Sequence, residues 1–233
     1  MIRMVKWPID IDTVQLQNSN ITVHEISGST HKKGTIPLED VNATVLNITN
    51  KKDGADSIYL TAGLRLFNNY VKEFNYSESY QDSLSSFRLN LRTSSMKLNE
   101  YSTITKPLAA ATINRGSAES LVASWSGNKH AAVGTMKFKY DRLKVKLLDK
   151  ENPDKKGFIL GLENFLANTL VVRKNNDRSS TVFYVRDKNK SVFNYWVKTK
   201  LSGVISTVVK PKTKSNDKKY KKLKDQYHLD QVK

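Results

Sequence analysis

The 233-residue chain contains no cysteine. This absence excludes a scaffold held by disulfides, catalysis by a thiolate and zinc sites built on thiolates. Glycine and proline are also sparse, at 10 and 5 residues, which excludes a collagen-like repeat. With 38% hydrophobic residues, the chain is long enough to bury a core of its own.

Long apolar runs are absent as well. No stretch reaches the roughly 18 consecutive apolar residues that a membrane-spanning helix needs. The N-terminal sequence MIRMVKWPID also lacks the apolar run of about 7–15 residues that marks a signal peptide. The sequence therefore predicts either a cytosolic protein or one whose targeting segment lies upstream of these residues.

The residues that catalysis needs are few and scattered. None of the four histidines has a carboxylate or a second histidine four residues away on a predicted helix. A Gly-x-Ser-x-Gly elbow, a phosphate-binding glycine loop and a dinucleotide fingerprint are all missing. Asp10 and Asp12 would share a strand face, but such a pair is typical of the solvent face of an edge strand. We therefore predict a non-enzymatic protein without catalytic, cofactor-binding or metal sites.

Acidic residues are too few to balance the basic ones. The chain has 39 lysines and arginines against 22 aspartates and glutamates, which gives a net charge of +17. Residues 186–233 hold 14 of these basic residues and only 4 acidic ones, a net charge of +10. A basic C-terminal segment indicates an anionic partner, either a lipid surface or nucleic acid, or else a solvated tail.

What the chain does have is alternation of apolar and polar residues. Residues 58–66, 87–91 and 136–147 alternate with a period of two, as half-buried strands do. Polar breaks recur about every 20–25 residues, as expected for a meander of hairpins rather than βαβ units. They fall at 27–34, 50–57, 77–86, 99–107 and 126–129. We expect further hairpin turns at Asn18–Asn20 and at Tyr140–Leu143.

The fold class predicted is mainly β. Residues 1–150 would form an extended, twisted antiparallel sheet, a meander with a groove-like shape. Residues 151–209 would form a C-terminal cap of the same domain, with about two amphipathic helices. The apolar spacing predicts these helices at 158–170 and 191–209, with Pro211 ending the second, and strands at 170–173 and 182–185 between them. Residues 210–233 have few apolar side chains, which predicts a disordered basic tail.

The helix predicted at 191–209 is the most informative element. A wide apolar face with an aromatic residue and flanking lysines (Lys190, Lys198, Lys200 and Lys210) suits a membrane interface, although the same face could instead pack on the sheet. For the apolar contact we expect Phe193, Trp196, Leu201 and Ile205. For the electrostatic contact we expect Lys210, Lys212, Lys214, Lys218, Lys219, Lys221, Lys222 and Lys224.

Nucleic acid is the less favoured anionic partner. The basic tail would suit it, but the sequence carries no helix-turn-helix, zinc-finger or RRM signature. The aromatic residues at 138–140 and 183–184 that might stack on bases also fit the alternation of buried strands. A nucleic-acid-binding domain and a structural module that binds only protein stay as alternatives.

Several stretches, taken in order, resemble the C-terminal region of AsmA-like envelope proteins of the Bacteroidetes type. The similarity covers about residues 5–209. It rests on GTIPLEDVNAT at 34–44, SYQDS at 79–83, KPLAA at 106–110 with RG at 115–116, GTMKF at 134–138, YDRLKVKLLD at 140–149, FLAN at 165–168, DKNKSVFNYW at 187–196 and LSG at 201–203.

This resemblance implies a protein of the cell envelope. AsmA-like proteins are similar to bridge-like lipid-transport proteins, with an N-terminal membrane anchor and a long twisted sheet that faces the periplasm. The apolar face of that sheet shields acyl chains, and the family is linked to outer-membrane lipid homeostasis. The resemblance thus implies a periplasm-facing module, attached to the membrane by an upstream anchor. Its partners would be phospholipid or an anionic membrane surface and other envelope proteins.

Overall fold

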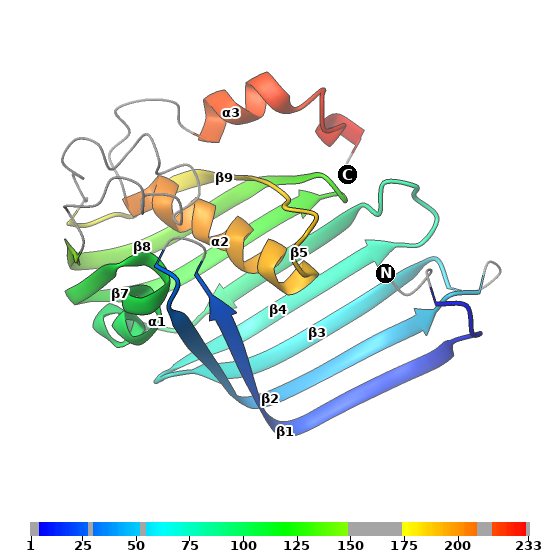
Figure 1. Ribbon diagram of the computed structural model, residues 1–233, viewed down its shortest axis with the longest axis horizontal. Coiled ribbons are helices and arrows are strands. Elements are labelled where there is room, and N and C mark those ends of the chain that lie inside the picture. The colour runs from blue at the N-terminus through cyan, green and yellow to red at the C-terminus, as the bar shows by residue number, and fades with distance from the viewer. Residues whose placement is uncertain (1–4, 28–29, 52–54, 149–173, 209–215, 232–233) are drawn as a thin grey trace.

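The computed structural model describes residues 5–27, 30–51, 55–148, 174–208 and 216–231. Within these ranges, the chain forms one open antiparallel sheet of nine strands and three α-helices, two of them near the C-terminus (Figure 1). The predicted fold class is therefore confirmed. The strands are β1 (Asp10–Ile26), β2 (Lys33–Thr49), β3 (Ser57–Leu66), β4 (Asn69–Ser79), β5 (Phe87–Thr93), β6 (Met96–Lys97), β7 (Ala111–Gly127), β8 (Ala131–Leu147) and β9 (Ser179–Val185). The helices are α1 (Ser102–Ala109), α2 (Val192–Val208) and α3 (Asn216–Leu223), with 3-10 turns at Leu98–Tyr101 and Leu229–Gln231.

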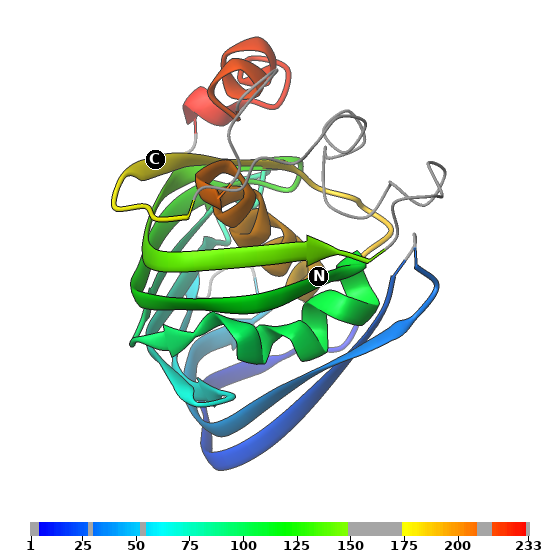
Figure 2. The same cartoon turned by 90° about the vertical axis from the view of Figure 1, so that its left-hand side faces the viewer.

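The sheet is a meander. Its order is β1-β2-β3-β4-β5-β7-β8-β9, and the short β6 pairs with β7. Four of the five predicted breaks lie between consecutive strands. The fifth, 99–107, instead holds the end of the 3-10 turn and most of α1, which connect β5–β6 to β7. The sheet curves strongly, so that its concave face wraps around α2 (Figure 2).

Two predicted hairpin turns are wrong. β1 continues through Asn18–Asn20, and β8 continues through Tyr140–Leu143. At both places the polar residues produce an irregular stretch of strand rather than a reversal, with Asn18 at φ 45° and Arg142 at φ 52°. Asparagine tolerates this left-handed conformation well, so a polar break can bend a strand as readily as it can end one.

The C-terminal part confirms one helix and one strand. α2 matches the helix predicted at 191–209, and β9 contains the strand predicted at 182–185. α2 lies on the concave face, mainly over β8 and β9 (Figure 1). The helix predicted at 158–170, the strand at 170–173 and the Pro211 helix end lie outside the described residues.

The prediction of a disordered tail is wrong for residues 216–231. Helix α3 and the 3-10 turn after it dock beside β9, where Tyr220 stacks on Phe183 with ring centroids 6.3 Å apart. Tyr220, Leu223 and Tyr227 pack against a small buried cluster that includes Leu229. The Asn216 side-chain amide also donates to the Thr181 carbonyl at 2.7 Å. A few well-spaced apolar side chains are therefore enough to order this lysine-rich segment.

Candidate functional site

The strand register gives the sheet one apolar and one polar face. Residues that pair across neighbouring strands lie on the same face, and i, i+2 neighbours share it. One row across the concave face is almost wholly apolar: Val14, Val45, Leu60, Tyr76, Leu89, Trp125, Gly134 and Val182. The next row, on the convex face, is wholly polar: Gln15, Thr44, Thr61, Asn75, Asn90, Ser124, Thr135 and Thr181.

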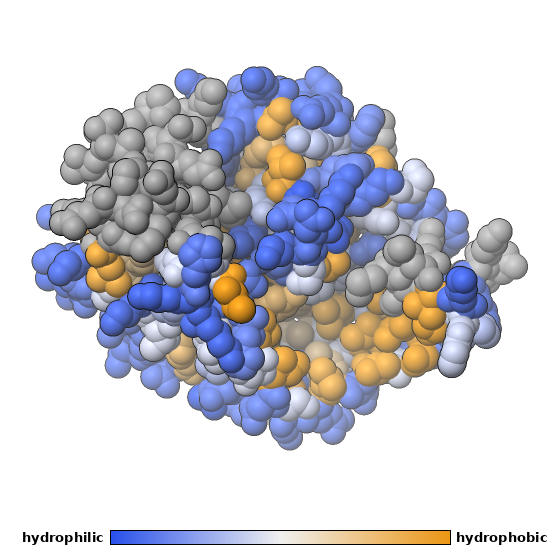
Figure 3. Space-filling model, viewed as in Figure 1, coloured by the Kyte–Doolittle hydropathy of each residue, from blue (hydrophilic) through white to orange (hydrophobic). Residues whose placement is uncertain are grey.

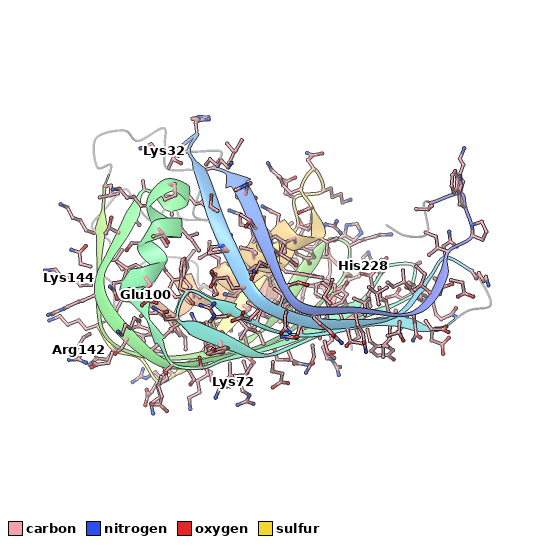
Figure 4. All side chains as sticks on the ribbon, turned by 90° about the horizontal axis from the view of Figure 1, so that it is seen from below. Lys32, Lys72, Glu100, Arg142, Lys144 and His228 are labelled. Carbon is pink, nitrogen blue, oxygen red and sulfur yellow. The ribbon has the colours of Figure 1, made fainter. Side chains whose placement is uncertain are left out.

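The convex face is polar and exposed to solvent. It carries a shallow depression of about 440 Å³, which is lined by Gln15, Thr44 and Asn75 of the polar row and also by Leu16, Ala43 and Ala62 of the neighbouring row. Lysine and arginine side chains, including Lys72, Arg142 and Lys144, point outward from this side of the molecule (Figure 4). The polar face is therefore an ordinary solvent surface, and the unusual chemistry lies on the concave side.

The concave face is covered over one half of the sheet. On β5, β8 and β9, Leu89, Met136 and Val182 are fully buried. On β4, Tyr76 and Phe74 are covered by Trp196 of α2, whose ring centroid lies 4.6 Å and 5.7 Å from theirs. This half is a conventional core between a sheet and a helix.

Over β1–β3 the same apolar face is only partly covered. Val14, Val45 and Leu60 are half-buried, and Leu16 in the next concave row remains 39% exposed. Figure 3 shows apolar side chains gathered in a hollow over these strands, next to α2. We call this surface the trough: Val14, Leu16, Ala43, Val45, Leu60 and Ala62, with Trp196 at its inner wall. A contiguous exposed apolar surface of this kind marks a binding site more often than a neutral surface.

The distal part of β1 and β2 forms a second wall. β3 pairs with β2 only from Glu39 to Leu46, so residues 33–38 of β2 pair with β1 alone. These residues, with 21–26 of β1, form a two-stranded arm that leaves the sheet and rises toward Lys32 (Figure 4). The inner side of the arm is apolar, with Val23, Ile36 and Leu38 half-buried.

α2 presents to the sheet only part of the apolar face that the sequence suggested: Trp196, Val204 and Val208 pack against the core, but they are not the most deeply buried residues of the helix. Its buried residues are mostly small or polar: Asn194, Tyr195, Lys198, Thr199, Ser202, Gly203 and Thr207. Gly203 lies so close to the sheet that an added Cβ would be 2.7 Å from Val182 Cγ2 and 2.9 Å from Met136 Cε. Close approach of helix and sheet therefore selects small side chains, a signal present in the sequence as Ser202-Gly203.

This orientation of α2 places the predicted apolar contact residues in different surroundings. Trp196 packs against the core, and its buried indole N–H has no hydrogen-bond partner among the described residues. Phe193, Leu201 and Ile205 lie on flanking sides of α2 and are half-buried. A role for these four residues in contact with a lipid or a partner stays a prediction.

One lysine of α2 is buried rather than solvated. Lys198, one of the lysines predicted to flank the apolar face, is 8% exposed and lies near Glu25 of the arm. Burial, with a smaller contribution from Lys190, lowers the pKa of Lys198 to about 8, and the Glu25 carboxylate partly opposes this shift.

The predicted tail lysines differ in their surroundings. Lys218, Lys221 and Lys222 are exposed on α3, and Lys219 is half-buried. Lys224 instead bonds to Asp230 at 3.1 Å, and this bond raises the pKa of Lys224. Lys210, Lys212 and Lys214 lie outside the described residues. α3 thus presents three exposed positive side chains on the side away from Tyr220 and Leu223.

Of the two aspartates considered for metal binding or catalysis, Asp10 is engaged in an ion pair. Asp10 pairs with Lys51 at 2.5 Å on the edge strand, and the hydrogen bond from Lys51 lowers the pKa of Asp10. No group of three or more His, Asp or Glu side chains in the described ranges is arranged to hold a metal ion. None of the described helices has the length and apolar composition that crossing a membrane requires.

No family model, curated protein or solved structure matches this chain. The resemblance to AsmA-like proteins therefore stays a prediction. The trough, with its apolar lining and its polar convex back, is the surface on which a functional hypothesis can be built.

Proposed function

We propose that the trough binds a hydrocarbon chain of a lipid, as part of a non-enzymatic, AsmA-like module of the cell envelope that handles lipids. The observation that carries this proposal is the half-covered apolar face over β1–β3. Over β8 and β9 the same face is covered by α2, and Trp196 of α2 covers Phe74 and Tyr76 of β4, whereas Leu16 stays 39% exposed. An apolar ligand that covered the trough would gain free energy in proportion to the apolar area removed from water.

The trough suits a segment of a single acyl chain. Along β1 it runs from Val14 to Leu16, which is about 7 Å at about 3.3 Å per residue. Across the sheet it extends from β1 to β3, about 10 Å at the usual strand spacing of about 4.8 Å. An apolar surface lined on these strands by aliphatic side chains alone favours a hydrocarbon over a peptide or a sugar.

The lysines of α3 complete the proposal. Lys218, Lys221 and Lys222 point away from the sheet, and lysines near an anionic membrane surface contribute on the order of 1 kcal/mol each. We propose that α3 holds the module at an anionic membrane surface while the trough takes up the chain. A nucleic-acid partner would use the same lysines but would leave the trough without a role.

Trp196 makes the proposal directly testable. Brominated fatty acids quench tryptophan fluorescence on contact, and Trp196 is the tryptophan at the wall of the trough. Trp125 is buried in the core at 2% exposure, and Trp7 is 79% exposed near the N-terminus. We expect dibromostearate to quench the full chain saturably, and Trp196→Phe to lose this quenching while it still binds a fluorescent fatty acid. Quenching that persists unchanged in Trp196→Phe, or no saturable quenching in the full chain, would contradict the proposal.

A further inference from the structure

The arm of β1 and β2 is joined to the sheet at a bend that both strands share. In β1 the bend lies at Asn18 with φ 45°, and in β2 it lies at Asp40 with φ 50°. Pairing between the strands shifts register on both sides of Ser19, which pairs with Val41. Two left-handed residues at the same level of a hairpin, flanked by register shifts, bend both strands at one place.

Side-chain amides replace the interrupted ladder at this bend. The Asn18 N–H donates to Asn42 Oδ1 at 3.1 Å, and the Asp40 N–H donates to Asn20 Oδ1 at 3.3 Å. Side-chain bonds of this kind keep the backbone satisfied without fixing one strand geometry as a regular ladder does. The arm beyond the bend is a two-stranded ribbon, and such a ribbon is only marginally stable by itself.

A small set of contacts holds the far end of the arm against the body. The Ser27 hydroxyl donates to the Leu108 carbonyl at 3.1 Å, and the Thr30 hydroxyl donates to the Pro107 carbonyl, both at the end of α1. On the side of α2, the Asn194 amide donates to Glu25 Oε1 at 2.9 Å. These hydrogen bonds are few, and beside them Gly34 packs against the buried Leu108 of α1.

The inner side of the arm faces the interior. Glu25 and Gly34 pair with each other and both turn toward the helices, because Glu25 bonds to Asn194 and Gly34 abuts Leu108. Val23 and Ile36, two residues nearer the bend, lie on this same face of the ribbon. The arm therefore presents apolar side chains inward, and polar contacts at its tip hold it closed.

We propose that the arm is a hinged lid of the lipid site, which opens at Asn18 and Asp40 and is latched by Ser27, Thr30 and Glu25. This inference rests on the proposed function of the trough. In the closed state the arm walls off the side of the site next to α1 and α2. A bound chain then exchanges only when the latch opens.

The absence of cysteine allows a clean test by a reversible lock. A Cβ on Gly34 would lie 2.4 Å from Leu108 Cγ. With a C–C bond of about 1.5 Å, it would lie no more than about 3.9 Å from Leu108 Cβ, so the two Cβ atoms are near enough for a disulfide, in which they lie about 3.5–4.5 Å apart. The variant Gly34→Cys/Leu108→Cys should therefore form a bond that ties the arm to α1. A matched control is His24→Cys/Thr35→Cys, a pair that faces across the arm and ties its two strands only to each other.

Release of a bound fluorescent fatty acid into excess oleate is the measurement. Oxidised Gly34→Cys/Leu108→Cys should release the probe at least about tenfold more slowly than its reduced form, whereas oxidation should leave the control unchanged. The latch variant Ser27→Ala/Thr30→Val should release it faster than the unmodified chain. Equal rates in the oxidised and reduced lock would overturn the lid, while binding itself would still support the trough. A probe that binds none of the proteins would overturn the proposed function and the lid with it.

Amide hydrogen exchange tests the hinge without a lipid. Amides of residues 21–26 of β1 and 33–38 of β2 should exchange faster than those of residues 10–16 of β1. The oxidised lock should slow exchange only in the arm. Uniform exchange along β1 would contradict a hinge at Asn18.

Discussion

Replacing Leu16 by glutamate is the sharpest perturbation of the trough. Leu16 lies on the concave face and is 39% exposed. Full burial of a leucine side chain is worth about 1.5–3 kcal/mol, so covering the exposed part with a hydrocarbon chain contributes about 0.6–1.2 kcal/mol. A glutamate would forfeit this and would also lose hydration of its carboxylate, which costs a further ~1–3 kcal/mol. Together these give about 2–4 kcal/mol, a loss of affinity of roughly 30- to 1,000-fold.

The matched control for this change is Gln15→Glu. Gln15 is the neighbouring residue on β1, is exposed and lies in the polar row of the convex face. We expect Gln15→Glu to bind a fluorescent fatty acid like the unmodified chain, because its new charge stays in water. The free energy of unfolding should change by no more than about 1 kcal/mol in either variant, since both positions are partly exposed. If Leu16→Glu keeps its affinity within about threefold, or if both variants weaken equally, the reasoning about the trough is refuted.

Two further predictions concern charge. Replacing the three exposed lysines of α3 by alanine should weaken binding to anionic vesicles by about 3 kcal/mol, or roughly 100-fold, at low salt. The residues replaced are Lys218, Lys221 and Lys222. Sedimentation with vesicles measures the binding, and unchanged binding would show that α3 is not the docking surface. The buried Lys198, whose pKa falls from 10.5 to about 8, binds its proton less readily in the folded than in the unfolded chain. Its contribution to the free energy of unfolding therefore rises with pH between about 8 and 10.5. Denaturant titrations should show that Lys198→Met removes this rise. Below pH 8 the free energy of unfolding of Lys198→Met should exceed that of the unmodified chain by the largest amount. Parallel pH profiles for the two proteins would contradict this prediction.

The sheet was predictable because alternation is a local property. β3 and β5 show their two faces in their own sequences, and four of the five polar breaks coincide with real connections between strands, whereas β4 was not predicted. The bends at Asn18 and Arg142 were not predictable in the same way. A short polar stretch favours a turn and a bulge alike. Which of the two forms depends on pairing with residues of β2 and β7, which lie outside the polar stretch itself.

The candidate site was only partly predictable for a related reason. Hydrophobic periodicity identified α2 and its apolar residues, of which Trp196, Val204 and Val208 pack against the core, but it did not identify the residues that lie nearest the sheet. Gly203 and Thr207 meet the sheet because small side chains let the backbones approach. The arm was not predicted from the sequence, because it leaves the sheet at the point where β3 stops pairing with β2. Helix α3 is ordered because Tyr220 and Leu223 pack against the sheet. The many lysines around these two residues favour disorder in the sequence, so the helix was not predicted.

The most direct test of the account is mass spectrometry of lipid extracted from the full chain purified without detergent. The account predicts about one acyl-chain lipid per protein molecule, and its loss in Leu16→Glu but not in Gln15→Glu. A lipid-free chain that also takes up no fatty acid from solution would contradict the claim that the half-covered face over β1–β3 is a lipid site.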